Sequence, residues 1–341
     1  MTFKGLATGI GSMPHKDVDR ALDLIFKYTP KIPFWPQLPK RDLRESMMIQ
    51  FAQNLPCIKV TNDGLLFDPR QSEKELEAFY SRIISQDVDY FRIGKEFASG
   101  LYRFYERLKR DGASGIEFIK CQIVGPFTFA AAINDDKGIA LMHDEIFMQA
   151  ILKGLQMKAL WQIKLFKEFG KKLILFLDEP YLGSFGSAFT PINRETITKV
   201  LGEFTEAIKS EDVLLGVHCC GNADWSIFTE VKNIDIISFD AFGFLDKIIL
   251  YSADLEKFFK RGGCLCWGIV PTQEFTDKIK TDLLTKRIES GIDKMVRKGI
   301  DNDLLVNNLL VSPSCGLATI DIVKSEQILR ILNEVSEALR S

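Results

Sequence analysis

Two segments far apart in the sequence combine metal-ligand residues with glycine after an apolar run. Residues 216–222 read GVHCCGN, and residues 312–317 read SPSCGL. His218 and Cys220 are two positions apart, so on a strand both side chains project to the same side. Zn²⁺ binds Cys sulfur and His nitrogen, usually tetrahedrally, and three protein ligands leave one position for a substrate. His218, Cys220 and Cys315 are therefore candidate zinc ligands, provided that the fold brings the two segments together.

A centre of this kind would activate a thiol. Two thiolates and one neutral imidazole around Zn²⁺ are formally neutral, so a substrate thiol can bind as a thiolate and stay nucleophilic. The alternative is that these side chains are ordinary core residues, because free Cys is often buried. Cys219, which would project to the opposite side of the strand, is interpreted as a packing residue. Cys264 and Cys266, within an apolar run and without a third ligand nearby, are interpreted in the same way.

Three carboxylates follow apolar runs and are candidates for binding the metal or the substrate at the same site. Asp240 could be a fourth, displaceable zinc ligand or a partner for His218, and the alternative is a helix N-cap. Asp178 and Glu179 are adjacent, and such a pair suits a substrate ammonium group, with one carboxylate facing inward and the other satisfied at the rim. Their alternative is a structural role as a loop anchor.

A glycine-containing segment near the N-terminus could bind an anion. Ile10, Gly11 and Ser12 offer backbone N–H groups and a hydroxyl, which suit a carboxylate. Neither the dinucleotide-binding glycine pattern nor a Walker motif is present.

The elements expected to position these residues alternate between strand and helix. Apolar runs that predict strands occur at 6–10, 32–37, 116–124, 173–177, 214–220, 236–239, 264–270 and 309–312. Helical patterns lie between most of them, which indicates parallel strands. Eight such strands predict an α/β fold, a single (β/α)₈ TIM barrel, in which the carboxyl ends of all strands meet at one mouth. The chain is interpreted as one domain, 1–341, with a long insertion at about 41–115 after the second strand.

Composition narrows the class of protein. The 341 residues are 46% hydrophobic and 26% charged, with a formal net charge of −2, so neither the proportions nor the charge favour a nucleic-acid partner. No apolar run approaches the ~20 residues needed to span a bilayer. Seven cysteines, an odd number without a secretory signal, lead us to expect reduced thiols in the cytoplasm.

Six short segments, in order along nearly the whole chain, resemble one known family. They are IGSMP (10–14), GPFT (125–128), DEP (178–180), HCC (218–220), SFD (238–240) and SPSCGL (312–317). The chain resembles the C-terminal catalytic barrel of cobalamin-independent methionine synthase, in a short single-barrel form. The wider group includes uroporphyrinogen decarboxylase and the methylcobamide:coenzyme M methyltransferases.

The resemblance implies methyl transfer to a zinc-bound thiolate, most simply that of homocysteine to give methionine. It implies that the zinc ligands are His218, Cys220 and Cys315, and that Asp240 stands where methionine synthases carry a glutamate ligand. It also implies that Ile10, Ser12 and Asp178 bind the amino-acid end of homocysteine.

Two departures from the family pattern concern the acceptor and the methyl donor. A His-Gly-Glu stretch after the second strand is replaced by residues 34–39, FWPQLP, and a histidine after the seventh strand is absent from residues 268–272, GIVPT. Methyltetrahydrofolate is a poor donor unless its nitrogen is protonated, whereas a methyl-corrinoid needs no such proton. Both donors, a methyl-corrinoid and methyltetrahydrofolate, stay open at this point. The expected partners are a small-molecule thiol and, if the donor is a methyl-corrinoid, the protein that carries it. A coenzyme M-type methyltransferase and a decarboxylase-like lyase are the alternative functions.

Overall fold

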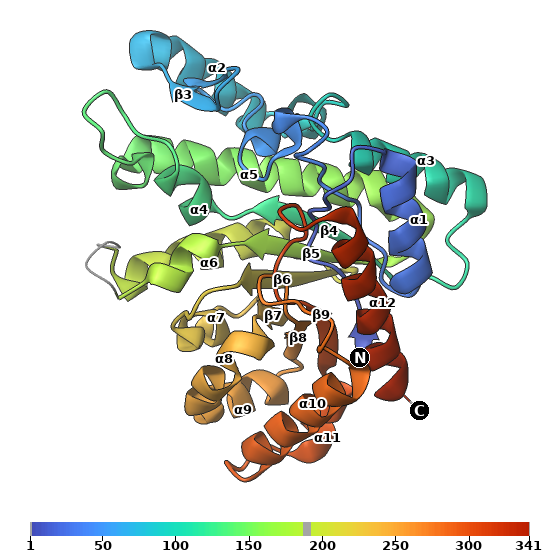
Figure 1. Cartoon of the computed structure of the whole chain (residues 1–341). Helices are drawn as coiled ribbons and strands as arrows, with labels where there is room; N and C mark the ends of the chain where they lie inside the picture. Colours follow the sequence, from blue (N-terminus) through green and yellow to red (C-terminus); the bar gives the residue numbers. More distant parts are fainter. Residues whose placement is uncertain (1, 187–191, 341) are drawn as a thin grey trace.

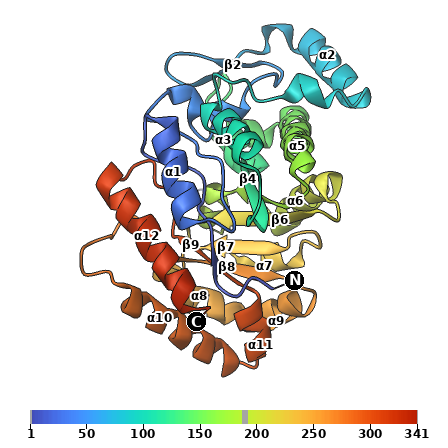
Figure 2. The ribbon, with the colours of Figure 1, turned by 90° about the vertical axis from the view of Figure 1, so that its right-hand side faces the viewer.

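A curled parallel sheet forms the centre of the molecule, and helices surround it (Figures 1 and 2). The structure is a computed structural model that describes residues 2–186 and 192–340. Its seven-stranded sheet has the order β1-β9-β8-β7-β6-β5-β4. The strands are β1 Leu6–Ala7, β4 Phe118–Val124, β5 Lys172–Asp178, β6 Val213–Cys219, β7 Ile236–Phe239, β8 Cys264–Val270 and β9 Leu309–Pro313. This curled sheet is consistent with a TIM-barrel-like fold.

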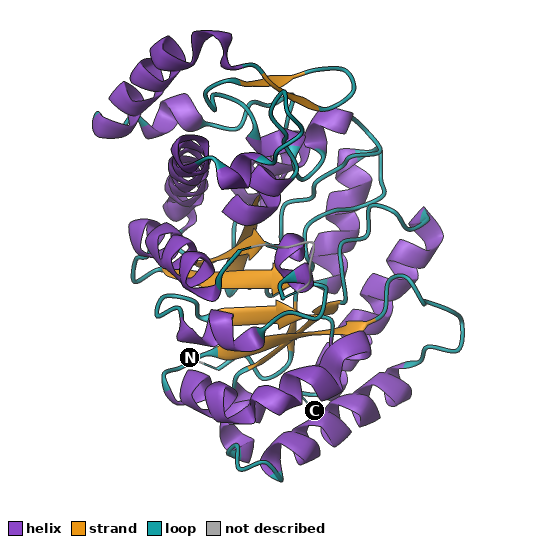
Figure 3. Ribbon diagram, turned by 90° about the vertical axis from the view of Figure 1, so that its left-hand side faces the viewer, coloured by secondary structure: helices purple, strands orange, loops and turns teal. Residues whose placement is uncertain are grey.

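Helices follow most of these strands and lie on the outside of the sheet, as Figure 3 shows. They are α1 Val18–Tyr28, α2 Ser72–Ile84, α3 Ser99–Asp111, α4 Pro126–Ala131, α5 Glu145–Phe166, α6 Arg194–Ile208, α7 Trp225–Glu230, α8 Ala241–Ile248, α9 Ser252–Lys260, α10 Thr281–Val296, α11 Asn302–Asn307 and α12 Ile322–Ala338. Acidic N-caps begin several of them. Asp17 accepts hydrogen bonds from backbone N–H groups of α1, and Asp321 does the same for α12. Among the described residues, no helix is both long and apolar enough to cross a membrane.

The second expected strand, 32–37, is not a regular strand. It makes two isolated parallel bridges, Phe34 to Lys120 of β4 and Gln37 to Ser12 beyond β1. Pro33 and Pro36 lack the N–H that a sheet ladder requires, which explains the interruption. The segment thus contacts both edges of the seven-stranded sheet, while a complete eight-stranded barrel stays a prediction.

Residues 41–115 contain a small hairpin and two helices. The hairpin pairs β2 Ile58–Val60 with β3 Leu65–Phe67, and it lies with α2 at one end of the molecule, beyond α5 (Figure 1). The sequence pattern predicts helices near 73–84 and 97–108, and the structure confirms them as α2 and α3. The pattern also predicts a helix near 45–54, and this prediction is wrong, because short 3₁₀ turns occupy 43–45 and 49–51 instead. The insertion boundaries and the single-domain assignment stay predictions.

The interior of the sheet changes from apolar to polar toward the carboxyl ends of its strands. Ile174 and Phe176 of β5 lie in a small apolar cluster with residues of the other strands, and Asp178 follows on the same side. Neighbouring strands then place His218 beside Asp178 and Ser238 beside His218 in the sheet register. Polar side chains therefore meet at the carboxyl-terminal edge.

Candidate metal and substrate site

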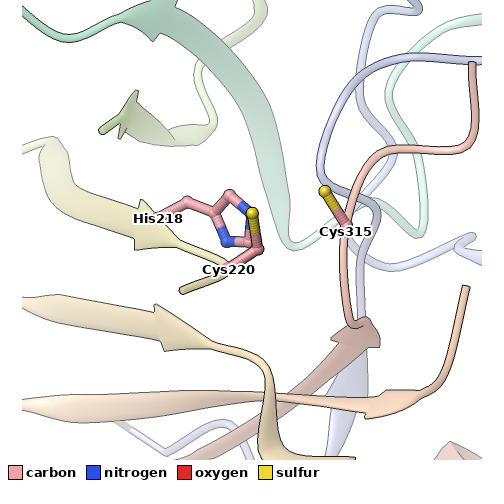
Figure 4. A group of neighbouring side chains, drawn as sticks. All are labelled: His218, Cys220 and Cys315. Carbon is pink, nitrogen blue, oxygen red and sulfur yellow. The ribbon is translucent and has the colours of Figure 1, made fainter. Parts of the chain in front are cut away.

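The structure brings His218, Cys220 and Cys315 together. One ligand atom from each lies within 4.8 Å of the other two. Among the described residues, these three form a group of His, Cys, Asp or Glu side chains that could hold a metal ion. Figure 4 shows Cys315 on a separate segment, across from His218 and Cys220. Tetrahedral zinc with Cys and His ligands needs ligand atoms about 3.5–4 Å apart, so small side-chain movements would complete the geometry.

His218 is held in an orientation suited to a ligand. Its Nδ1 lies 3.0 Å from the Ser238 hydroxyl, and its Nε2 is buried and has no hydrogen-bond partner among the described residues. A buried, unpartnered nitrogen costs stability unless something binds it. Metal-ligating histidines usually have their second nitrogen held by a neighbouring polar group, as Ser238 does here. The donor set and the free nitrogen thus fit a zinc ion.

The two thiols of the cluster shift each other's pKa in opposite directions. A hydrogen bond from the Cys315 thiol, together with His218, lowers the pKa of Cys220 to about 4. The same contact with Cys220, with burial, raises the pKa of Cys315. Cys220 is therefore the first thiolate of the pair, and a cation would favour ionisation of both.

Three of the five cysteines outside the cluster are interpreted from the sequence as packing residues. Cys219 is buried on the opposite side of β6, and burial raises the pKa of its thiol to about 12. Cys264 and Cys266 lie in the apolar interior of the sheet, and burial raises the pKa of both thiols. These thiols are protonated at neutral pH, so the structure agrees with the interpretation of all three as packing residues.

Asp240 is the N-cap of α8. Its Oδ1 accepts a hydrogen bond of 2.8 Å from Gly243 N–H, and burial raises the pKa of its carboxyl group. It faces the same cavity as Cys220 and Cys315 but is outside the three-residue cluster. The capping alternative is thus present, and ligation by the second oxygen stays a prediction.

Asp178 and Glu179 have different surroundings. Asp178 is buried, and its Oδ1 has no hydrogen-bond partner, while burial raises the pKa of its carboxyl group to about 6. Glu179 is also buried, but its oxygens accept from Phe127 N–H, Thr128 N–H and the Thr128 hydroxyl at the start of α4. Glu179 is thus the carboxylate of the pair that neighbouring groups satisfy, because the α4 N-terminus uses both of its oxygens. A substrate contact of Glu179 stays a prediction. Asp178 keeps a free oxygen.

Ile10, Gly11 and Ser12 lie beside the segment that carries Cys315. Ser12 C=O accepts from Leu317 N–H at 2.9 Å, and a Cβ on Gly316 would come within 2.2 Å of the Ser12 hydroxyl oxygen. This close approach explains the need for glycine at position 316. The three residues are not among those that line the cavity at Cys315.

Sequence reasoning missed two buried polar residues of β4, Lys120 and Gln122. Both are 0% exposed and project to the interior of the sheet. Burial lowers the pKa of Lys120 to about 8, and Asp178 opposes that shift. The signal in the sequence was present, because two polar residues two apart in a fully buried parallel strand must face one side together.

A cavity of about 500 Å³ opens in front of Cys220 and Cys315. Its other lining residues are Asp240, Phe242, Gly243, Phe244, Pro271, Thr272, Gln273, Glu274 and Ser314. The cavity therefore joins the two sulfur ligands to an aromatic wall and two carboxylates, and no lysine or arginine of the described residues lines it.

Comparisons with known proteins include a distant likeness to a solved structure. No family model matches the chain, and no curated protein matches it. Among solved structures, a B12-independent methionine synthase from Shewanella sp. W3-18-1, in complex with selenomethionine, is 18% identical with a TM-score of 0.48. The likeness covers 70% of this chain and 66% of that chain. This likeness is too distant to assign an activity.

Proposed function

We propose that this protein is a zinc-dependent methyltransferase that moves a methyl group to the thiolate of homocysteine, giving methionine. The single observation that carries the proposal is the His218, Cys220 and Cys315 cluster, in which the ligand atoms lie within 4.8 Å of one another. The unpartnered Nε2 of His218 supports a bound cation at that place. The fold proposed with it is a (β/α)₈ barrel in which residues 32–37, second in chain order, complete the set of eight strands.

Bound zinc would supply a Lewis-acidic position at which a substrate thiol ionises near neutral pH and stays nucleophilic. The chain's own residues then have separate tasks. Ser238 fixes the ring of His218, and Cys220 and Cys315 would both hold the ion as thiolates. The buried setting of these groups strengthens every electrostatic interaction with the thiol.

Asp178 and the 10–12 segment would hold the acceptor. The free Oδ1 of Asp178 suits an ammonium group, and backbone N–H groups at Gly11 and Ser12 suit a carboxylate. Together they would fix the amino-acid end of the acceptor and aim its thiol at the metal, which is how positioning lowers a barrier. Glu179 would act indirectly, by fixing the start of α4.

The cavity favours a methyl-corrinoid over methyltetrahydrofolate as the donor. The family that the chain resembles carries a histidine after the seventh strand as a proton donor to the folate nitrogen, whereas this chain has Pro271 and Thr272 in that stretch. No histidine lines the cavity among the described residues. A corrinoid donor needs no such proton because its cobalt leaves directly. Its carrier would be a partner protein that docks at the mouth of the sheet.

The alternatives predict other features of the site. A decarboxylase-like lyase would need basic residues for substrate carboxylates, and the cavity offers Asp240 and Glu274 instead. A coenzyme M-type enzyme would keep the metal but not need Asp178 for an ammonium group.

Metal content and single-turnover methyl transfer test the proposal together. The purified protein should hold about one zinc per chain. Methylcobalamin and methyltetrahydrofolate should each be crossed with homocysteine and coenzyme M, and methylcobalamin with homocysteine should react fastest. Full activity of the metal-free protein would overturn the proposal. A faster reaction with coenzyme M than with homocysteine would mean that coenzyme M, not homocysteine, is the acceptor.

Replacing Ser238 by alanine should weaken zinc binding about 10–100-fold, the usual cost of losing a group that orients a ligating histidine. The reason is that His218 Nδ1 loses its 3.0 Å contact and the ring is free to rotate. A competition titration with a chelator measures the effect. Ser325→Ala is the matched control, because Ser325 is an equally buried serine that bonds only within α12. Equal affinities in both variants would count against the orienting role.

A further inference from the structure

Lys120 is a fully buried ammonium group with few partners. It is 0% exposed, and its Nζ donates to the Ile10 carbonyl and, at 3.3 Å, to Gln122 Oε1. The face of the Phe176 ring lies 4.7 Å from Nζ. No carboxylate of the described residues forms an ion pair with it at 4.0 Å or less, although Asp178 is close enough to influence its charge. Burying a lysine in this way is costly, so a compensating role is expected.

The hydrogen bond to Ile10 sets the direction of a peptide group. In a trans peptide the C=O and N–H point in opposite directions. Since the Ile10 carbonyl is directed at the buried ammonium, the Gly11 N–H points away from it. Neither Gly11 N–H nor Ser12 N–H donates a hydrogen bond within the described parts of the chain. Gly11 also has a φ of +155°, and a Cβ there would come within 2.9 Å of the Gln122 side chain. The Ile10–Gly11 backbone is therefore held between Lys120, which bonds the Ile10 carbonyl, and Gln122, which packs against Gly11.

These free N–H groups are near the metal ligands. The segment 10–12 is bonded to the segment after Cys315 through Ser12 and Leu317. The pale N-terminal chain passes beside Cys315 in Figure 4. If the thiol of an acceptor binds the metal, the amino-acid end of that acceptor therefore lies close to Gly11 and Ser12. Lys120 lies on the other side of the Ile10–Gly11 peptide.

We propose that Lys120 is a positioning residue that selects acceptor thiols carrying a carboxylate. The hydrogen bond from Lys120 holds the Ile10–Gly11 peptide so that the Gly11 N–H can donate to the carboxylate of the acceptor. The positive charge of Lys120, on the other side of this peptide, attracts the same carboxylate. The inference rests on the proposed function, since it assigns a role within the same site. It adds a residue outside the metal cluster that decides which thiols bind.

Thiol binding to the cobalt(II)-loaded protein tests this without turnover. Two thiols, homocysteine and 3-aminopropanethiol, differ only by the carboxylate, and the sulfur-to-cobalt absorption band reports the binding of each. In Lys120→Met the preference for homocysteine should fall about 10–100-fold, the usual range for losing one hydrogen bond to a charged group. The affinity for 3-aminopropanethiol and the metal content should not change.

Lys158→Met is the matched control. Lys158 is an equally buried lysine, on α5, whose Nζ contacts only the Phe91 carbonyl at 3.5 Å. This variant should keep the preference for homocysteine. Lys120→Gln, which is shorter and uncharged, should move the preference in the same direction by a smaller factor, and it carries the test if Lys120→Met does not fold.

The outcomes separate this inference from the function on which it rests. An unchanged preference in the Lys120 variants, or an equal loss for both thiols, would overturn the role of Lys120 alone. Failure of the wild-type cobalt protein to bind any thiol would overturn the proposed function itself.

Discussion

Replacing Cys315 by serine should remove both the bound zinc and methyl transfer. Cys315 is the one cluster member that comes from a separate segment, so its loss leaves two ligands on a single strand end (Figure 4). Losing a group that merely orients a ligand costs about 10–100-fold in affinity, and losing a ligand should cost more than about 100-fold. Metal analysis of the purified variant and single-turnover transfer to homocysteine measure the two losses.

Cys219→Ser is the control for this variant. Cys219 neighbours Cys220 in the chain, but its side chain lies on the other side of β6, near Gly183 and Gly221. The control should keep its zinc, although removing a buried thiol lowers stability somewhat. A Cys315→Ser protein with one zinc per chain and unchanged transfer would show that the cluster is not the active metal site.

The sheet was largely predictable because its strands are buried on both faces. Six apolar runs from 116 to 312 became β4 to β9 within about two residues, since parallel strands under helices need continuous apolar sequence. The conformation of residues 32–37 was harder to predict. Their two prolines break the ladder, so tertiary contacts with Lys120 and Ser12, rather than local sequence, hold the segment in place.

The ligand cluster was predictable in part from spacing. Two residues two apart on a strand share a side, which brought His218 and Cys220 together, but the place of Cys315 depended on the fold. Which of the two adjacent carboxylates is satisfied by the protein could not be read from the sequence, because the partners of Glu179 are N–H groups of α4, 51 and 52 residues earlier in the chain. Lys120 was missed because a lysine in an apolar run reads as an interruption, while its long side chain in fact reaches the Ile10 carbonyl.

Lys158→Met should stabilise the protein, and by an amount that depends on pH. Lys158 lies fully buried in α5 and forms no ion pair with the described residues, so burial lowers the pKa of its ammonium group from 10.5 to about 7. Between these two values the unfolded chain binds a proton that the folded chain does not, so the free energy of unfolding rises with pH. Near pH 7 the free energy of unfolding of the wild-type protein is therefore lowered by most of the cost of burying this lysine, about 4–5 kcal/mol.

Urea unfolding of Lys158→Met and wild type across pH 7 to 10.5 measures this cost. The difference in the free energy of unfolding should be largest near pH 7 and shrink as pH approaches 10.5, because the lysine is then neutral in both states. Lys164→Met is the control, since Lys164 is on the same helix but exposed and paired with Asp89, and its effect should stay within about 0.5 kcal/mol at every pH. A pH-independent difference for Lys158 would mean that its amine keeps its charge in the folded protein, and any stabilisation would then reflect packing of the methionine against Phe91.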